Sequence, residues 1–157
     1  MGHWVRIAAA FAVAGCSSAN DSAGGTSDHT VDASAIFQGS ASIRGLVALP
    51  APSSGRGIQL HVTSTATGAR AGDFVGPAGT TAGTTVAYEI TGLAPGQYVL
   101  QMRVDQSNDG VVGGSGDFDG YTGGTVKSPV VDRSMATPIS VGAGGASGVD
   151  FGLAITP

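Results

Sequence analysis

The chain has little charge and few of the residues that favour helices. Only 11% of its 157 residues are charged, and it contains one glutamate, one lysine and 27 glycines. Straight-chain side chains such as Glu and Lys favour helices, whereas the β-branched Val and Thr, which are plentiful here, favour strands. The composition therefore predicts a single small all-β domain.

Positive charge is scarce as well. Seven Lys and Arg stand against eleven Asp and Glu, which gives a net charge of -4. Such a chain offers no electrostatic attraction for a phosphate backbone, so a nucleic-acid partner is not expected.

The sequence also lacks the common catalytic motifs. It has no Gly-x-Ser-x-Gly elbow, no Gly-Lys phosphate loop and no His-Glu-x-x-His zinc motif. Among its three histidines, a general base would have to be His61, which lies on the polar side of an expected strand. We therefore expect a non-catalytic protein with no small-molecule substrate and no cofactor other than calcium. An accessory hydrolase that uses His61 and an aspartate is the alternative.

The first residues have the layout of a secretory signal. One positive charge precedes an apolar run over residues 7–14, and small residues then lead to Cys16. This run is shorter than the roughly 20 apolar residues that a membrane-spanning helix needs. Residues 1–15 are therefore predicted to be a cleaved signal peptide.

Val13-Ala14-Gly15-Cys16 resembles the lipobox of bacterial lipoproteins. The resemblance implies cleavage before Cys16, diacylglycerol on its sulfur and acylation, as by palmitate, of the new amino group. Two or three acyl chains anchor a protein stably. Ser17 stands where inner-membrane lipoproteins have an aspartate, so the resemblance implies the outer membrane in an organism with two membranes. The alternative for Cys16 is a free buried thiol or an intermolecular disulfide.

Residues 16–35 continue as a polar segment that is rich in Ser, Ala, Gly, Thr and Asp, and Val31 is its only large apolar residue. Such a segment buries too little apolar surface to offset its ordering entropy. We expect the lipidated Cys16 to be followed by a flexible tether that spans roughly 25 Å.

From residue 41 onward apolar and polar residues alternate, as in strands with one buried face. Strands are expected at 42–49, 58–63, 85–90, 98–104, 139–141 and 149–154, with a weaker one at 125–131 and a loop at 76–85. Six or seven short strands predict a small antiparallel sandwich with one-sided sheets over residues 36–157.

Gly92-Leu93-Ala94-Pro95-Gly96 predicts a hairpin between two of these strands. With its flanks it resembles the carboxypeptidase regulatory-like and transthyretin-like domains, which carry Gly-Leu-x-Pro-Gly-x-Tyr between alternating strands. Ile43-Arg44-Gly45-Leu46-Val47 also resembles their first strand. The resemblance implies a Greek-key sandwich, prealbumin-like or immunoglobulin-like, that serves adhesion, stabilisation or spacing.

Residues 105–124 hold four aspartates and seven glycines without a strand pattern. Asp105, Ser107 and Asp109 match the first positions of a calcium loop, and Asp117 and Asp119 can supply further carboxylates. The position of the bidentate glutamate holds a glycine, so a solvated loop without a metal is the alternative.

The same loop offers Phe118 and Tyr121, whose rings beside carboxylates are candidates for binding a glycan or a protein. Taken together, the sequence predicts a lipid-anchored, non-catalytic module of the cell envelope with a structural, adhesion or binding role. Its expected partners are the membrane, through Cys16, and an envelope protein. A carbohydrate-binding subunit and an assembly subunit that pairs through a strand edge are alternatives.

Overall fold

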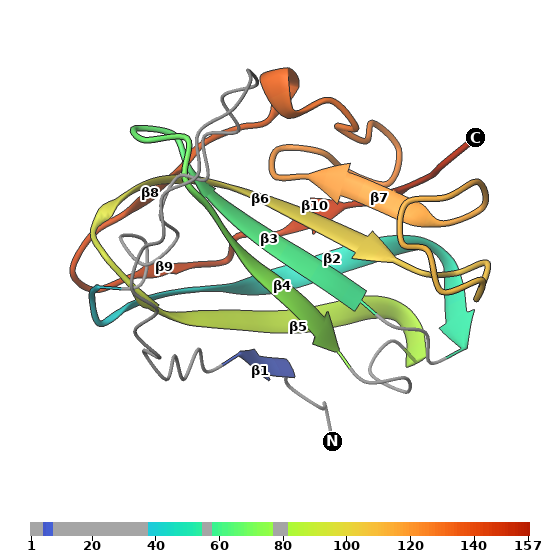
Figure 1. Ribbon diagram of the computed structural model, residues 1–157, viewed down its shortest axis with the longest axis horizontal. Helices are drawn as coiled ribbons and strands as arrows, with labels where there is room; N and C mark the ends of the chain where they lie inside the picture. Colours follow the sequence, from blue (N-terminus) through green and yellow to red (C-terminus); the bar gives the residue numbers. More distant parts are fainter. Residues whose placement is uncertain (1–4, 8–37, 55–57, 77–81) are drawn as a thin grey trace, which may run out of the picture.

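The computed structural model describes residues 5–7, 38–54, 58–76 and 82–157, and these residues form an all-β sandwich of two sheets (Figure 1). One short 3₁₀ helix, η2 (Arg133–Met135), lies in a connection. The prediction of an all-β sandwich is confirmed. Cys16, the predicted tether and most of the predicted signal peptide lie outside the described residues.

Sheet A is built around a long antiparallel pair. Its order is β1 (Val5–Ile7), β5 (Ala82–Leu93), β2 (Ala41–Ser54) and β10 (Phe151–Gly152), and β9 (Ala146–Ser147) also pairs with β2. β2 and β5 are antiparallel, whereas β9 and β10 run parallel to β2 and β1 runs parallel to β5. The expectation of purely antiparallel sheets is therefore wrong for sheet A, which is mixed.

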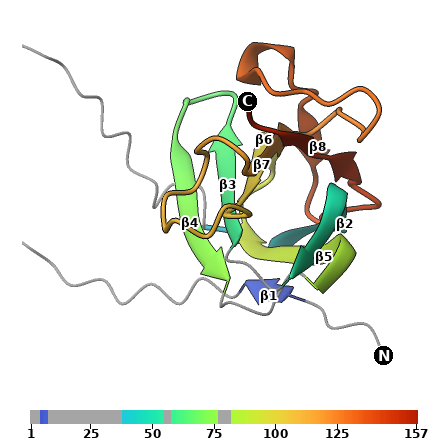
Figure 2. The ribbon, with the colours of Figure 1, turned by 90° about the vertical axis from the view of Figure 1, so that its right-hand side faces the viewer.

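Sheet B is antiparallel throughout its described strands. Its order is β11 (Ala154–Ile155), β7 (Phe118–Tyr121), β6 (Gly96–Val104), β3 (Ile58–Ser64) and β4 (Arg70–Gly76), and β8 (Ile139–Val141) also pairs with β6. Figure 2 shows β3 and β4 on one side of the molecule and β2 and β5 on the other, with β1 beside β5.

The predicted hairpin at 92–96 is wrong. The strands that this segment joins, β5 and β6, lie in different sheets, so the chain crosses here from sheet A to sheet B. Leu93 is fully buried in the crossing, and the Tyr98 hydroxyl donates to the Ala94 carbonyl at 2.7 Å. Alternation shows which face of a strand is buried. Because both sheets bury one face on the same core, it does not show to which sheet a strand belongs.

Other strand boundaries differ from the expectation too. β2 continues through Pro50 and Pro52 to Ser54, and its register with β5 shifts between Ala48 and Ser53. A β-bulge of this kind tolerates prolines, which cannot donate to a regular ladder.

Three segments were assigned to the wrong class. β4 was not expected, β5 begins inside the expected 76–85 loop, and β7 lies inside the expected 105–124 loop. The weak strand expected at 125–131 is absent from the described residues, which place there a single bridge between Thr125 and Ser128.

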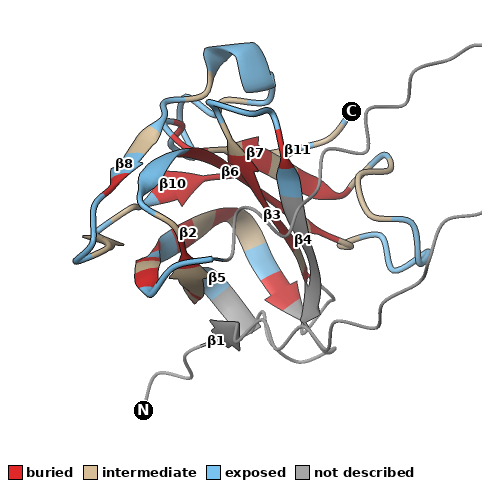
Figure 3. Ribbon diagram, turned by 60° about the vertical axis from the view of Figure 1, so that its left-hand side comes forward, coloured by how far each residue is buried: buried red, intermediate tan, exposed pale blue. Residues whose placement is uncertain are grey.

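The core lies between the two sheets, and burial concentrates in the strands while most loops are exposed (Figure 3). Each fully buried large aliphatic side chain stabilises the fold by about 1.5–3 kcal/mol. The alternation in β3 and β6 places its apolar members in this core, as predicted: Ile58, Leu60, Val62, Tyr98, Leu100, Met102 and Val104.

The C-terminal segment connects the two sheets. It pairs with β6 through β8, crosses to β2 through β9 and β10, and returns to β7 through β11. The backbone of this segment packs directly against the backbone of β2 at Gly45. A Cβ at this position would clash with the Val149 carbonyl oxygen, which would lie 2.0 Å away. The segment therefore closes one side of the sandwich, and it needs glycine at position 45 to do so.

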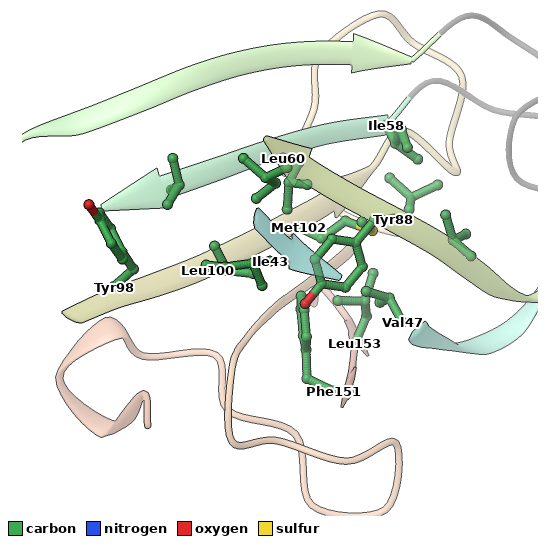
Figure 4. Packing of buried hydrophobic residues seen from close by; sticks show 14 of the residues in the cluster. Ile43, Val47, Ile58, Leu60, Tyr88, Tyr98, Leu100, Met102, Phe151 and Leu153 are labelled. Carbon is green, nitrogen blue, oxygen red and sulfur yellow. The ribbon is translucent and has the colours of Figure 1, made fainter. Parts of the chain in front are cut away.

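Tyr88 links β5 to this segment through the core (Figure 4). Its buried hydroxyl donates to the Val149 carbonyl at 2.7 Å, and its ring meets that of Phe151 edge-on with 6.0 Å between the centroids. Burial, and then the charge of Asp150, raise the pKa of Tyr88 far above its usual value. The phenol therefore stays protonated and keeps its role as a donor.

Tyr88→Phe is expected to lower the free energy of unfolding by about 1–3 kcal/mol, because the hydrogen bond from the fully buried Tyr88 to the Val149 carbonyl is lost while the ring packing remains. Urea unfolding followed by circular dichroism measures this loss. The control, Tyr121→Phe, removes a hydroxyl from a half-buried ring outside the core and should stay within about 0.5 kcal/mol of the unchanged protein. Equal effects of the two substitutions would contradict a special role for the Tyr88 hydroxyl.

Candidate functional site

The loop over residues 105–117 leaves β6 and enters β7 at one end of sheet B. Asp105 shapes its first turn by accepting the N–H groups of Asn108 at 2.7 Å and Gly110 at 3.2 Å, and the Ser107 hydroxyl at 3.4 Å. Aspartate favours such turns because its short side chain reaches backbone amides a few residues further on. This carboxylate is therefore engaged within the loop itself.

Asp117 holds the far side of the same loop. Its side chain is fully buried, and one of its oxygens accepts the Ser107 N–H at 3.0 Å. The other oxygen accepts the N–H groups of Gly113 at 2.8 Å and Gly114 at 3.0 Å. Burial alone would raise the pKa of Asp117, but these hydrogen bonds outweigh it and keep the pKa below its usual value. The ionised carboxylate thus ties three points of the loop together.

The remaining predicted calcium ligands turn to other partners. Asp109 accepts the Val111 N–H at 2.8 Å, and Asp119 accepts side-chain donors from β6. Within the parts of the chain that the structure describes, no three His, Cys, Asp or Glu side chains are placed to hold a metal ion. Calcium binding by Asp105, Ser107, Asp109, Asp117 and Asp119 stays a prediction, and the geometry shows these carboxylates as acceptors for amides and side chains.

Asp119 forms a network across two paired strands. Gln101 Nε2 donates to both of its oxygens, at 2.9 and 3.1 Å. Arg103 Nε donates to Oδ2 at 3.2 Å and forms an ion pair there. The loop backbone lies against this pair, since a Cβ on Gly113 would be 3.4 Å from the guanidinium carbon of Arg103. The network therefore joins the loop to the sheet.

The strand register extends this network into a polar patch on the side of sheet B that faces away from the core. His61, Gln101 and Tyr121 form one row across β3, β6 and β7, and Gln59, Arg103 and Asp119 form the next row. We call these six residues the polar face. His61 and Gln101 are each 4% exposed, whereas Arg103, Asp119 and Tyr121 are half-buried. Gln59 is half-buried as well, so solvent reaches the row of Gln59, Arg103 and Asp119 and the ring of Tyr121, and is largely excluded from His61 and Gln101.

The sequence pattern of β6 contains a signal for Gln101 and Arg103. Both alternate with core residues along β6, so the pattern already placed them together on the opposite face of that strand. Their pairing with Asp119 depends on β7, which was not expected to be a strand.

The two predicted ligand-binding aromatic residues lie on opposite faces of β7. Phe118 is buried in the hydrophobic core, so this position gives its predicted role in ligand binding no support. Tyr121 belongs to the polar face, because residues 119 and 121 point to the other side of the strand. Burial and the charge of Asp119 raise the pKa of Tyr121, and Arg103, Arg70 and Arg133 counteract that rise. Tyr121 therefore lies within the electrostatic reach of three arginines.

His61 occupies the polar side of β3 as expected, but with 4% exposure it is buried and not a surface residue. A general base must come within hydrogen-bond distance of a substrate proton. This geometry does not support the alternative of a hydrolase that works through His61.

No family model, curated protein or solved structure matches the chain. The described residues also contain no helix that is long and apolar enough to cross a membrane.

Asp117→Asn is expected to lower the free energy of unfolding at neutral pH by about 1–3 kcal/mol, because an amide has one acceptor oxygen for three N–H donors. The pKa of Asp117 is lowered on folding, so the ionised carboxylate stabilises the fold above its unfolded pKa. That stabilisation is lost as the pH falls through the folded pKa.

The unchanged protein should therefore lose more stability between about pH 5 and pH 2 than the Asp117→Asn variant does. Urea unfolding across this pH range measures the difference. Asp109→Asn, which alters an exposed carboxylate with one amide partner, is the matched control. Identical pH profiles for Asp117→Asn and the unchanged protein would contradict the role given to Asp117.

Proposed function

We propose that the protein is a non-catalytic binding module of the bacterial cell envelope, held to the membrane by acyl chains on Cys16. The binding surface in this proposal is the 105–117 loop with the β7 side of the polar face, and the partner is another envelope protein. The lipobox resemblance of residues 13–16 supports the anchor.

The observation that carries the proposal is the position of the loop relative to the chain's entry into the sandwich. Gly39 donates its N–H to the Gly92 carbonyl at 3.1 Å, so the described chain enters beside the crossing between β5 and β6. The loop leaves from the other end of the nine-residue strand β6, after Val104 (Figure 1). A strand of this length spans about 30 Å, so the loop lies at the end of the domain opposite to the entry of the chain, where a membrane tether leaves it free for a partner.

The chemistry of the loop suits binding more than catalysis. Its carboxylates are engaged with its own amides, which pre-orders a glycine-rich segment and reduces the entropy lost when a partner binds. Val111 is 63% exposed in the loop, Arg103 lies against the loop backbone at Gly113, and Tyr121 belongs to the neighbouring polar face. Tyr and Arg are the residue types that contribute most at protein interfaces.

Cys16→Ser is expected to abolish labelling by a palmitate analogue and to leave an uncleaved precursor, because the thiol that receives the lipid is gone. Labelling in growing cells and the intact mass of the purified protein measure both effects. Ser17→Ala leaves the thiol in place and is the control. Lipid labelling of the Cys16→Ser variant equal to that of the unchanged protein would refute the anchor.

A photo-reactive amino acid at Val111 is expected to cross-link one defined envelope protein in intact cells. The same group at Ala66, which is exposed in the turn after β3 at the opposite end of the sandwich, is the matched control. Mass spectrometry of the adducts identifies the partner. Equal adducts from the two positions would contradict the assignment of the loop as the binding surface.

A further inference from the structure

The outer edge of sheet A is covered by a segment that the proposed processing removes. β1 runs parallel to β5 with Val5 opposite Tyr88, Arg6 opposite Glu89 and Ile7 opposite Ile90. β1 is the terminal strand of this sheet (Figure 2). It lies inside residues 1–15, which the proposed function assigns to a cleaved signal peptide, so the mature chain would lose this cover from β5.

A strand edge without a neighbour presents N–H and C=O groups that pair readily with another extended chain. The seating of β1 shows that this part of β5 accepts a strand in parallel register. The other edge of β5 is occupied along most of its length by β2. The edge beside β1 is therefore the one that processing opens.

Glu89 gives this edge a chemical preference. It is the only glutamate in the chain, and an arginine lies opposite it on both neighbouring strands, Arg44 on β2 and Arg6 on β1. Arg44 Nη2 lies 3.2 Å from Glu89 Oε1, and 19% of the Glu89 side chain is exposed. Opposite charges on directly paired residues stabilise strand pairing. A basic residue opposite Glu89 is thus favoured at this edge.

The neighbours of Glu89 on β5 determine which residue types an incoming strand needs on either side of the basic residue. Tyr88 and Ile90 are buried and belong to the core, so residues opposite them lie on the apolar side of the sheet. In β1 these positions hold Val5 and Ile7. An incoming strand therefore needs an apolar, a basic and an apolar residue in succession.

We propose that the edge of β5 in the mature protein binds an extended segment of a partner protein by parallel strand addition, with a basic residue opposite Glu89 and apolar residues on either side. This inference rests on the proposed function, because it requires removal of residues 1–15.

The test uses the processed protein purified from cells in detergent and a fluorescent peptide with the sequence of residues 3–9, HWVRIAA. Fluorescence anisotropy is expected to show saturable binding. Replacing the peptide's arginine by glutamate should weaken binding about three- to tenfold, since a favourable pair becomes a repulsive one. Replacing the peptide's valine by proline removes a backbone N–H donor and disfavours regular strand pairing. This replacement should abolish binding.

The charge swap identifies the site. Glu89→Lys is expected to weaken binding of the arginine peptide and to strengthen binding of the glutamate peptide. Thr67→Lys places a lysine in an exposed turn and should leave the order of the two peptides unchanged. If Glu89→Lys fails to fold, as judged by circular dichroism, the binding of the three peptides to the unchanged protein still tests the proposal.

Each other outcome overturns the inference. Equal binding of the three peptides would mean adsorption to the micelle, and absence of binding would mean that the edge accepts no strand. Sedimentation of the processed protein as a dimer without peptide binding would make a second copy the occupant. Intact mass separates the two proposals: an uncleaved chain overturns both, whereas a cleaved chain that binds no peptide overturns only the strand addition.

Discussion

A single backbone carbonyl, that of Val149, joins three segments of the sandwich. It lies so close to β2 that only a glycine at position 45 leaves room for it, and it accepts the Tyr88 hydroxyl from β5. Gly45 and Tyr88 are register partners, so the glycine provides the space and the tyrosine provides the donor at the same point. A buried carbonyl without a donor costs about 1–3 kcal/mol. The positions of β2, β5 and the C-terminal segment therefore depend on one another.

The same C-terminal segment supports the candidate site. Beyond β10 it pairs with β7, and Thr156 exchanges hydrogen bonds with the end of the loop, donating to the Asp117 carbonyl at 2.7 Å and accepting the Gly116 N–H at 2.9 Å. Asp117 then gathers the loop amides with its carboxylate. The loop is thus held from its backbone side by the closure and from its side-chain side by one buried charge.

Much of the fold could be predicted from alternation, and its failures have specific causes. Ile58, Leu60 and Val62 were placed correctly because burial on one face is a local property of a strand. The sheet to which β6 belongs is not local, and so the crossing at 92–96 was mistaken for a hairpin. β7 is not evident from the sequence because Gly120 interrupts its pattern. The strand needs a glycine at this position, because a Cβ there would come 2.7 Å from the Gly152 carbonyl oxygen. That glycine reflects a tertiary contact that no local pattern reveals.

The candidate site shows a similar limit. The sequence placed five oxygen-bearing side chains close together, but it did not show which donors they would meet. The backbone decides this, because Gly110, Gly113 and Gly116 adopt positive φ values of 82°, 92° and 87° that few other residues tolerate, and the N–H groups of the first two reach carboxylates. Asp117 and Asp119 are two residues apart in the sequence, but their side chains have different surroundings. Asp117 lies among loop amides, and Asp119 faces Arg103 across the strand pair. In a chain with 11% charged residues, backbone amides provide most of the partners that carboxylates need, and this makes the loop an ordered surface.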